Sequence, residues 1–320
     1  MRRRALIVGM GAATALPVVA QARPPAKPNI GILVLGDPDP QPFVKTFREG
    51  LHELGYVEGQ NIVLDIRSAK GDSNRLSYLA ETLVRSNVDI LVAYQTPAAT
   101  AAQKATRSIP IVMAYVGDPV ATGLVSSLSR PGGNITGSST VADELAGKNL
   151  ELLRQFLPSA HRVGVLANAV DTFTEPFLEQ VRQAAGHLSF EVQLYLIHPG
   201  DNTGRAFSQM RSDRVDVVIV QSSLLRPDTV ELTLKYHLPT ISPISVFSRA
   251  GGLMSYAANP EESLRQSAFY VDKILKGSKP GDLPIQQPTR FELVINLKTA
   301  KALGLTVPPL LLVRSDEVIE

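Results

Sequence analysis

Residues 89–120 read DILVAYQTPAATAAQKATRSIPIVMAYVGDPV, and this stretch decides the fold. Its apolar runs at residues 89–93 and 111–115 are short and predict β-strands, whereas residues 98–106 between them predict a helix. Two strands that are joined through a helix form a right-handed βαβ unit, in which both strands lie parallel in one sheet. The stretch therefore predicts an α/β fold.

The same alternation of strand and helix continues on both sides of this unit. Residues 30–35 are apolar throughout, which predicts a strand that is buried on both faces of a parallel sheet. Further helices are predicted at residues 43–54, 76–84, 144–157 and 299–303. Further strands are predicted at residues 62–66, 163–167, 191–197, 215–220, 240–241 and 291–297, and a turn is predicted at residues 131–133, before residues 134–137.

Two successive runs of strands and helices predict two doubly wound parallel-sheet lobes, joined by crossover strands that act as a hinge. The N-terminal lobe is expected at residues 29–139 plus about 258–289, and the C-terminal lobe at residues 140–257 plus about 290–320. The crossovers are expected near residues 138–140, 256–260 and 287–289. Ligands of open α/β sheets bind beyond the carboxyl ends of the strands, so two facing lobes create one cleft.

The first 22 residues predict an export signal. Three arginines at residues 2–4 precede a short apolar run, and the sequence AQA at residues 20–22 fits a signal-peptidase site. We expect cleavage after Ala22 and a linker at residues 23–28; an uncleaved anchor is the alternative. Residues 3–4 also leave open the choice between the general and the twin-arginine export routes. The chain has no cysteine, so a lipid-modified cysteine anchor is excluded.

Composition excludes several classes of function. Cleavage removes three of the 32 basic residues and none of the 30 acidic ones, leaving a net charge of −1, which does not favour nucleic-acid binding. Without cysteine there is no thiol nucleophile or thiolate zinc site. The five histidines are scattered without metal-ligand spacing, and no phosphate-binding or hydrolase motif is present. We therefore expect no catalysis, no cofactor and no metal.

Candidate ligand-binding residues of the first lobe follow two predicted strands. Thr96 is predicted to cap the next helix, with Pro97 at its first position, because proline has no N–H to leave unpaired there. Such a helix start can bind a carboxylate. The residues following these two strands are Tyr94, Gln95, Thr96, Pro97 and Ala98 after the first, and Tyr115, Gly117 and Asp118 after the second. Asp118 is interpreted mainly as a cap of its own helix.

In the second lobe, short polar residues follow the predicted strands. They are Asn168, Gln221, Ser222, Ser223 and Ser242. Because the side chains at 221–223 are neutral, they cannot balance a buried ammonium group, and this predicts a small carboxylate solute without a strong need for an ammonium partner. Tyr94, Tyr115 and Phe247 are candidates for an aromatic wall, or alternatively for core packing.

Several segments resemble a known family along the whole predicted mature chain. They are residues 53–59 (ELGYVEG), 96–99 (TPAA), 109–112 (IPIV), 117–120 (GDPV), 123–128 (GLVSSL), 130–137 (RPGGNITG), 250–256 (AGGLMSY), 291–304 (FELVINLKTAKALG) and 314–320 (RSDEVIE). In these segments the chain resembles ABC-transporter substrate-binding proteins related to the tryptophan/tyrosine-type receptors, of the type I periplasmic binding protein fold.

The resemblance implies a periplasmic, monomeric receptor that binds a small carboxylate-bearing solute between its lobes and delivers it to an ABC permease in the inner membrane. In this family Thr96 matches the carboxylate-binding region, and an Asp or Asn often stands where this chain has residues 221–223. That departure puts an amino-acid ligand in doubt, although an aromatic or branched amino acid remains the alternative. An effector-sensing regulator lacks support because no helix-turn-helix precedes residue 29, and an enzyme using carboxylates alone lacks a predicted pair of acids.

Overall fold

The apolar run at residues 30–35 is buried on both faces of a sheet, as predicted. In the computed structural model, which describes residues 27–36, 41–140 and 142–320, it forms strand β1 (Asn29–Val34) and the residue after it. Leu33 belongs to one hydrophobic core, whereas Ile30 and Ile32 belong to another on the opposite face. Alternate side chains of a strand point to opposite faces, so a strand that is covered on both sides must be apolar throughout.

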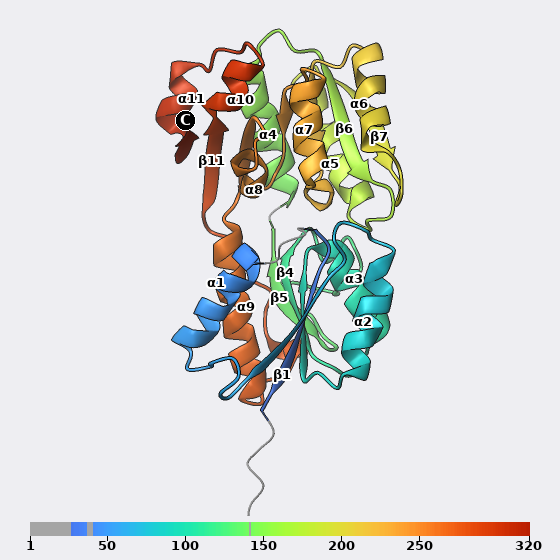
Figure 1. Cartoon of the computed structure of the whole chain (residues 1–320), viewed down its shortest axis with the longest axis vertical. Coiled ribbons are helices and arrows are strands. Elements are labelled where there is room, and N and C mark those ends of the chain that lie inside the picture. The colour runs from blue at the N-terminus through green and yellow to red at the C-terminus, as the bar shows by residue number, and fades with distance from the viewer. Residues whose placement is uncertain (1–26, 37–40, 141) are drawn as a thin grey trace, which may run out of the picture.

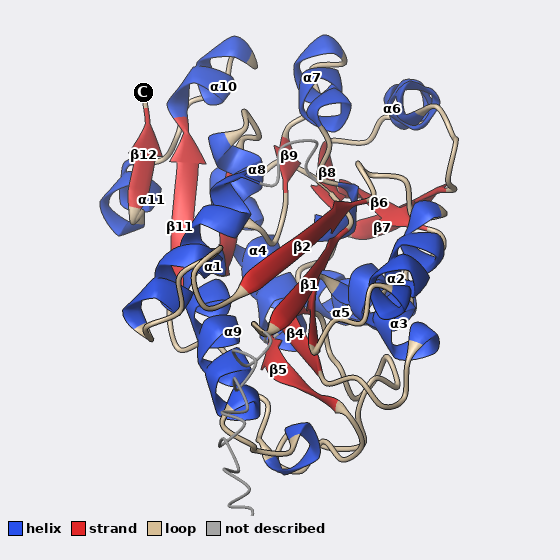
Figure 2. Ribbon diagram, turned by 60° about the horizontal axis from the view of Figure 1, so that its bottom comes forward, coloured by secondary structure: helices blue, strands red, loops and turns tan. Residues whose placement is uncertain are grey.

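The N-terminal lobe is a doubly wound α/β layer. Its five strands lie parallel in the order β2-β1-β3-β4-β5. The other strands are β2 (Val63–Ser68), β3 (Ile90–Tyr94), β4 (Ile111–Val116) and β5 (Ile135–Ser139). Helices α2 (Arg75–Arg85) and α3 (Thr96–Ala105) cover one face, and α1 (Gln41–Glu53) and α9 (Pro260–Leu275) cover the other (Figures 1 and 2). The α/β class and the parallel sheet are confirmed.

The C-terminal lobe contains a seven-stranded sheet in the order β12-β11-β10-β9-β8-β6-β7. Its strands are β6 (Arg162–Asn168), β7 (Glu191–Ile197), β8 (Val217–Val220), β9 (Thr240–Ile241), β10 (Met254–Ala258), β11 (Phe291–Asn296) and β12 (Glu317–Ile319). Its helices are α4 (Ala142–Phe156), α5 (Thr174–His187), α6 (Thr203–Ser212), α7 (Pro227–Lys235), α8 (Ser245–Arg249), α10 (Leu297–Ala302) and α11 (Pro309–Arg314). Short 3₁₀ helices are η1 (Ser222–Leu224) and η2 (Pro280–Asp282).

The sheet of the C-terminal lobe departs from the predicted parallel arrangement at one pair of strands. β11 runs antiparallel to β10, while β12 runs parallel to β11. The reason is the path of the chain, which leaves this lobe at the cleft end of β10, forms α9 in the other lobe and re-enters from the cleft (Figure 1). A strand that starts where its neighbour ends must run in the opposite direction.

Three connections join the two lobes: β5 to α4, β10 to α9, and η2 to β11. Two of them are bonded to each other, because the backbone N–H of Ser139 donates to Gln286 O at 2.9 Å and the N–H of Gln286 donates to Gly137 O at 3.0 Å. The lobes are stacked end to end, with these connections along one side (Figure 1).

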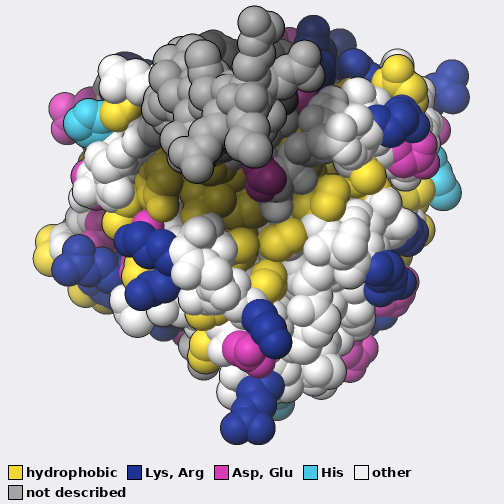
Figure 3. Space-filling model, turned by 90° about the horizontal axis from the view of Figure 1, so that it is seen from below, with side chains coloured by type: hydrophobic (Ala, Val, Ile, Leu, Met, Phe, Trp, Pro, Cys, Tyr) yellow, Lys and Arg dark blue, Asp and Glu magenta, His cyan; other side chains and the backbone are white. Residues whose placement is uncertain are grey.

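The predicted leader at residues 1–22, its cleavage site and most of the linker lie outside the described residues. Within residues 27–36, 41–140 and 142–320, no helix combines the length and the apolar character that a membrane span requires. Acidic and basic side chains lie interspersed over the far end of the N-terminal lobe (Figure 3).

Candidate ligand-binding site

The carboxyl ends of the strands of both lobes meet in a cleft that holds two adjoining cavities. The smaller has a volume of about 20 Å³, room for about one water molecule. The larger has a volume of about 590 Å³, within the usual range of ligand sites. Gln95 from the N-terminal lobe and Ser222 from the C-terminal lobe line both cavities, and the Nε2 of Gln95 donates to the carbonyl oxygen of Ser222 at 3.3 Å.

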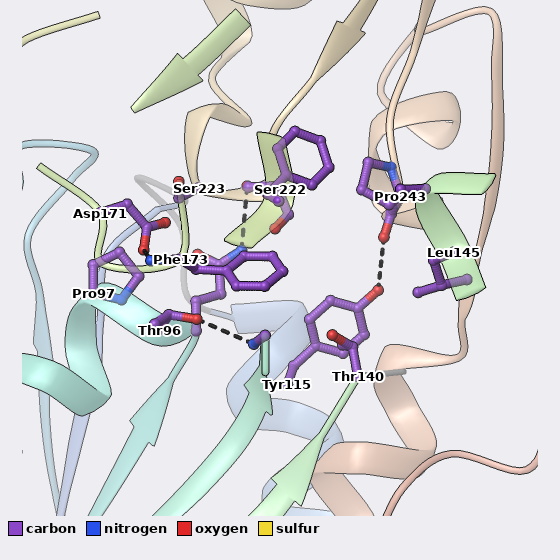
Figure 4. Close-up of a pocket in the computed structure, with 14 residues that line it drawn as sticks. Thr96, Pro97, Tyr115, Thr140, Leu145, Asp171, Phe173, Ser222, Ser223 and Pro243 are labelled. Atoms are coloured by element: carbon purple, nitrogen blue, oxygen red, sulfur yellow. Dashed lines mark hydrogen bonds between the residues drawn. The ribbon is translucent and has the colours of Figure 1, made fainter. Parts of the chain in front are cut away.

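The start of α3 lies at the smaller cavity, but its capping differs from the prediction. Gln95, not Thr96, is the N-cap residue, and Thr96 is the first residue of the helix. Gln95 has a φ of 68°, a conformation that is costly for a residue with a side chain. The Oγ1 of buried Thr96 instead accepts a hydrogen bond from the backbone N–H of Gly117 at 3.1 Å (Figure 4). Thr96 thus joins the ends of β3 and β4.

This geometry predicts a measurable role for the Thr96 hydroxyl. Replacing Thr96 by valine keeps the shape but leaves the buried N–H of Gly117 without an acceptor, and we expect the free energy of unfolding to fall by about 1–2 kcal/mol. Urea unfolding of Thr96→Val measures the loss, and Thr96→Ser, which keeps the hydroxyl, serves as the control. Equal stability of the valine variant and the parent would contradict the assignment of this hydrogen bond.

Tyr115 and Asp118 both serve the protein's own structure. Tyr115 lines the smaller cavity with a φ of 56°, and its OH donates to the carbonyl oxygen of Pro243 in the other lobe at 3.1 Å. The Oδ1 of Asp118 accepts from the backbone N–H groups of Val120 and Ala121, both at 2.9 Å. The interpretation of Asp118 as a local cap is right, but the residues after it form turns and not the predicted helix.

A buried carboxylate that the sequence analysis missed lies across the cleft from α3. Asp171 is only 6% exposed and lines the smaller cavity together with Ser222 and Ser223 (Figure 4). Its Oδ2 accepts from Gln221 Nε2 at 3.1 Å, and its Oδ1 accepts from the backbone N–H of Phe173 at 2.9 Å. Burial raises the pKa of Asp171 to about 6, although the Phe173 N–H and the Ser223 hydroxyl act against this rise.

Residues 221–223 are neutral, as the sequence analysis noted, but Asp171 places an acid beside them. The sequence analysis considered only the residues at the very ends of the strands, and Asp171 stands three residues beyond the end of β6. Gln221, which was assigned to the ligand, instead holds the loop that carries Asp171: its Oε1 accepts from the backbone N–H of Asn168 at 2.8 Å, and its Nε2 donates to Asp171. The smaller cavity is therefore lined by a buried carboxyl group.

The other predicted ligand-binding residues fall into two groups, those that line one of the cavities and those that line neither. Pro97 and Gly117 line the smaller cavity, and Tyr94 lines the larger. Ala98, Asp118, Asn168 and Ser242 line neither. Ser242 is fully buried and donates to the carbonyl oxygen of Val220, and Phe247 is fully buried in the core and forms no wall of the cleft.

The loop at residues 168–173 makes several contacts between the lobes. The ring of Phe173 lies against Gly117: a Cβ on Gly117 would come within 2.6 Å of the ring carbons. The hydroxyl oxygens of Thr172 and Thr100 are 3.2 Å apart, and Asn168 Nδ2 lies 3.4 Å from the Oγ of Ser73. The same loop therefore carries Asp171 and holds the two lobes together.

No site for a metal is evident among the described residues, in which no three or more histidine or acidic side chains are grouped to hold an ion. The geometry instead combines a helix start, a buried carboxylate and apolar walls between two lobes. Such an arrangement can bind and enclose an organic solute.

Comparison with known proteins agrees with this geometry. The sequence profile of the family described as ABC transporter substrate binding protein matches residues 29–319. A curated relative, a tyrosine-binding protein of Clostridioides difficile, is 30% identical over 298 residues, which cover 90% of this chain and 85% of the relative.

Two solved structures are similar over nearly the whole chain, both at 27% identity. One, from Streptococcus pneumoniae, is in complex with L-Trp; it has a TM-score of 0.82 and the match covers 92% of this chain and 100% of that one. The other is the ligand-free, open structure of a substrate-binding protein with adhesive properties from Clostridium difficile; it has a TM-score of 0.63 and the match covers 92% of this chain and 99% of that one.

Proposed function

The chain belongs to the ABC transporter substrate-binding protein family, and from this premise we propose that its solute is a free α-amino acid bound in the cleft between the lobes. The chain is a substrate-binding protein and not an enzyme. Proteins of this family bind their solutes outside the cytoplasm.

The observation that carries the proposal is Asp171, a buried carboxylate opposite the start of α3. The positive end of the helix dipole favours the ligand carboxylate, and Asp171 offers a counter-ion to the ammonium group. A buried charge is tolerated when it is paired, so a zwitterion fits this site better than a solute with one charge. We thus adopt the amino-acid alternative of the sequence analysis in place of a carboxylate without an ammonium group.

The relatives support the same ligand class. One curated relative is named for tyrosine, and one similar structure holds L-Trp. The higher TM-score against that complex than against the ligand-free, open structure supports a closed arrangement of the lobes here. With room for about one water molecule in the smaller cavity, a solute enters only when the lobes part.

Calorimetry with paired ligands tests the proposal. We expect one of L-tyrosine, L-tryptophan and L-leucine to bind at least about tenfold more tightly than the same compound without its amino group, because only the amino acid pairs with Asp171. In Asp171→Asn this preference should disappear. Equal or tighter binding of the deaminated compound to the parent protein would favour a plain carboxylate and refute the amino-acid assignment.

The place and the partner of the protein follow from the same proposal. We propose export to the periplasm with cleavage after Ala22, and delivery of the solute by the monomer to an ABC permease. The lobes are proposed at residues 29–139 plus about 258–289 and residues 140–257 plus about 290–320, with the hinge near residues 138–140, 256–260 and 287–289. In support of this hinge, the strands β5 and β10 end next to the first two segments.

A further inference from the structure

The larger cavity of the cleft has a composition unlike that of the smaller one. Most of its lining residues are apolar and come from both lobes, among them Val34, Tyr94 and Leu225. Its charged lining residues are Arg226, Glu231, Arg249 and Glu261. With about 590 Å³ it has room for a solute with a sizeable hydrocarbon body. Burial of such a body against apolar walls is favourable, but it does not by itself select one solute over another.

Charged side chains at the walls can select among apolar solutes by their charge. The guanidinium of Arg249 is already paired, with Glu317 at 2.8 Å and Glu292 at 3.3 Å. Arg226, by contrast, forms no hydrogen bond or ion pair with the part of the chain that the structure describes, and its Nε is buried. The side chain of Arg226 reaches across the cleft, with its Nε 3.5 Å from the position of a Cβ on Gly71.

Arg226 is partly buried, and its buried Nε has no partner among residues 27–36, 41–140 and 142–320. This is costly, because arginine stays charged under all ordinary conditions. Its planar fork of N–H donors matches a carboxylate in particular. An organic anion with an apolar body would pack against the apolar walls and pair its charge with Arg226.

We propose that the larger cavity is a second binding site, which takes an apolar organic anion and pairs its carboxylate with Arg226. This site does not depend on the amino-acid proposal, since its ion pair uses Arg226 and not Asp171. Because Gln95 and Ser222 line both cavities, the two sites adjoin within one cleft.

Calorimetry with 4-phenylbutyrate and its neutral amide tests the proposal on the mature chain. We expect the acid to bind at least about tenfold more tightly than the amide, and Arg226→Met to remove that difference while it leaves the weak binding of the amide unchanged. Lys235→Met is the matched control, because Lys235 is a cation at the other end of α7, the helix that Arg226 precedes, and does not line the cavity; it should bind the acid like the parent. Glu231→Gln removes an acid from the wall and should strengthen binding slightly.

The outcomes separate this proposal from the amino-acid one. Absence of 4-phenylbutyrate binding, equal binding of acid and amide, or equal binding of the acid to Arg226→Met and the parent would each overturn it. Binding of the acid through Arg226 without binding of any amino acid would leave this site standing and refute the proposed function. Binding of an amino acid without binding of 4-phenylbutyrate would support the proposed function and refute the second site.

Discussion

Replacing Gly117 by alanine is expected to hold the lobes apart and to weaken solute binding by roughly tenfold to a hundredfold. In the closed arrangement, three ring carbons of Phe173 lie 2.6–2.7 Å from the position that the new Cβ would occupy, closer than real Cβ contacts come. Overpacking of this kind costs about 1–3 kcal/mol. The cost falls on the closed state, because Gly117 and Phe173 belong to different lobes and separate when the cleft opens.

Binding is weakened because the population of the closed, binding-competent state falls, and the apparent affinity falls in proportion. Scattering at a solute concentration that just saturates the parent should give a larger radius of gyration for Gly117→Ala than for the parent, and calorimetry should give the lower affinity. The double variant Gly117→Ala with Phe173→Ala removes the clash and should recover closure.

A second glycine provides the control for this prediction. Gly186 lies in α5 and has no atom within 4 Å of the position of an added Cβ, so Gly186→Ala makes the same chemical change in open space. It should bind and close like the parent. If the double variant remains as open and as weak as Gly117→Ala alone, the contact between Gly117 and Phe173 does not govern closure.

Strands of the sheets could be predicted from the sequence because a strand that is buried on both faces is apolar throughout. Residues 30–35 and 111–115 are apolar throughout, and both strands lie in the middle of a sheet with helices on each face. The direction of β11 could not be read in this way, since it depends on where the chain re-enters the lobe. The pattern of apolar and polar residues within β11 does not depend on the route by which the chain returns to the lobe.

The site was harder to predict, for a related reason. The strand-end rule located Gln95, Thr96 and Ser222, because parallel strands bring their carboxyl ends to one edge. Asp171 was missed because the loop beyond β6 turns back into the cleft, and Gln221 holds it there through a contact between side chains 50 residues apart. The positive φ of Gln95 likewise could not be predicted, because glutamine is not a residue type that favours this conformation.

The affinity for an amino acid is expected to fall as the pH decreases below about 6, and to be roughly 30-fold lower at pH 4.5 than at pH 7.5. Burial raises the pKa of Asp171 to about 6 in the solute-free protein, so below this pH the carboxyl is neutral and must release a proton before it can pair with an ammonium group. Above pH 6 the carboxylate is already charged and the affinity should be constant. Calorimetry at several pH values, in buffers of different ionisation enthalpy, measures both the affinity and the protons released.

The direction of this dependence distinguishes the two solute classes. A carboxylate without an ammonium group is repelled by charged Asp171, so its affinity should rise as the pH falls through 6, opposite to that of an amino acid. Asp171→Asn removes the titrating group of the protein. In this variant the dependence of the amino acid should flatten, and that of the carboxylate should flatten at pH values above the range in which its own carboxyl group titrates. An amino-acid affinity that stays constant from pH 7.5 to 4.5 in the parent protein would mean that Asp171 does not meet the ammonium group, because a buried carboxyl with a pKa of about 6 cannot bind a cation without titrating in that interval.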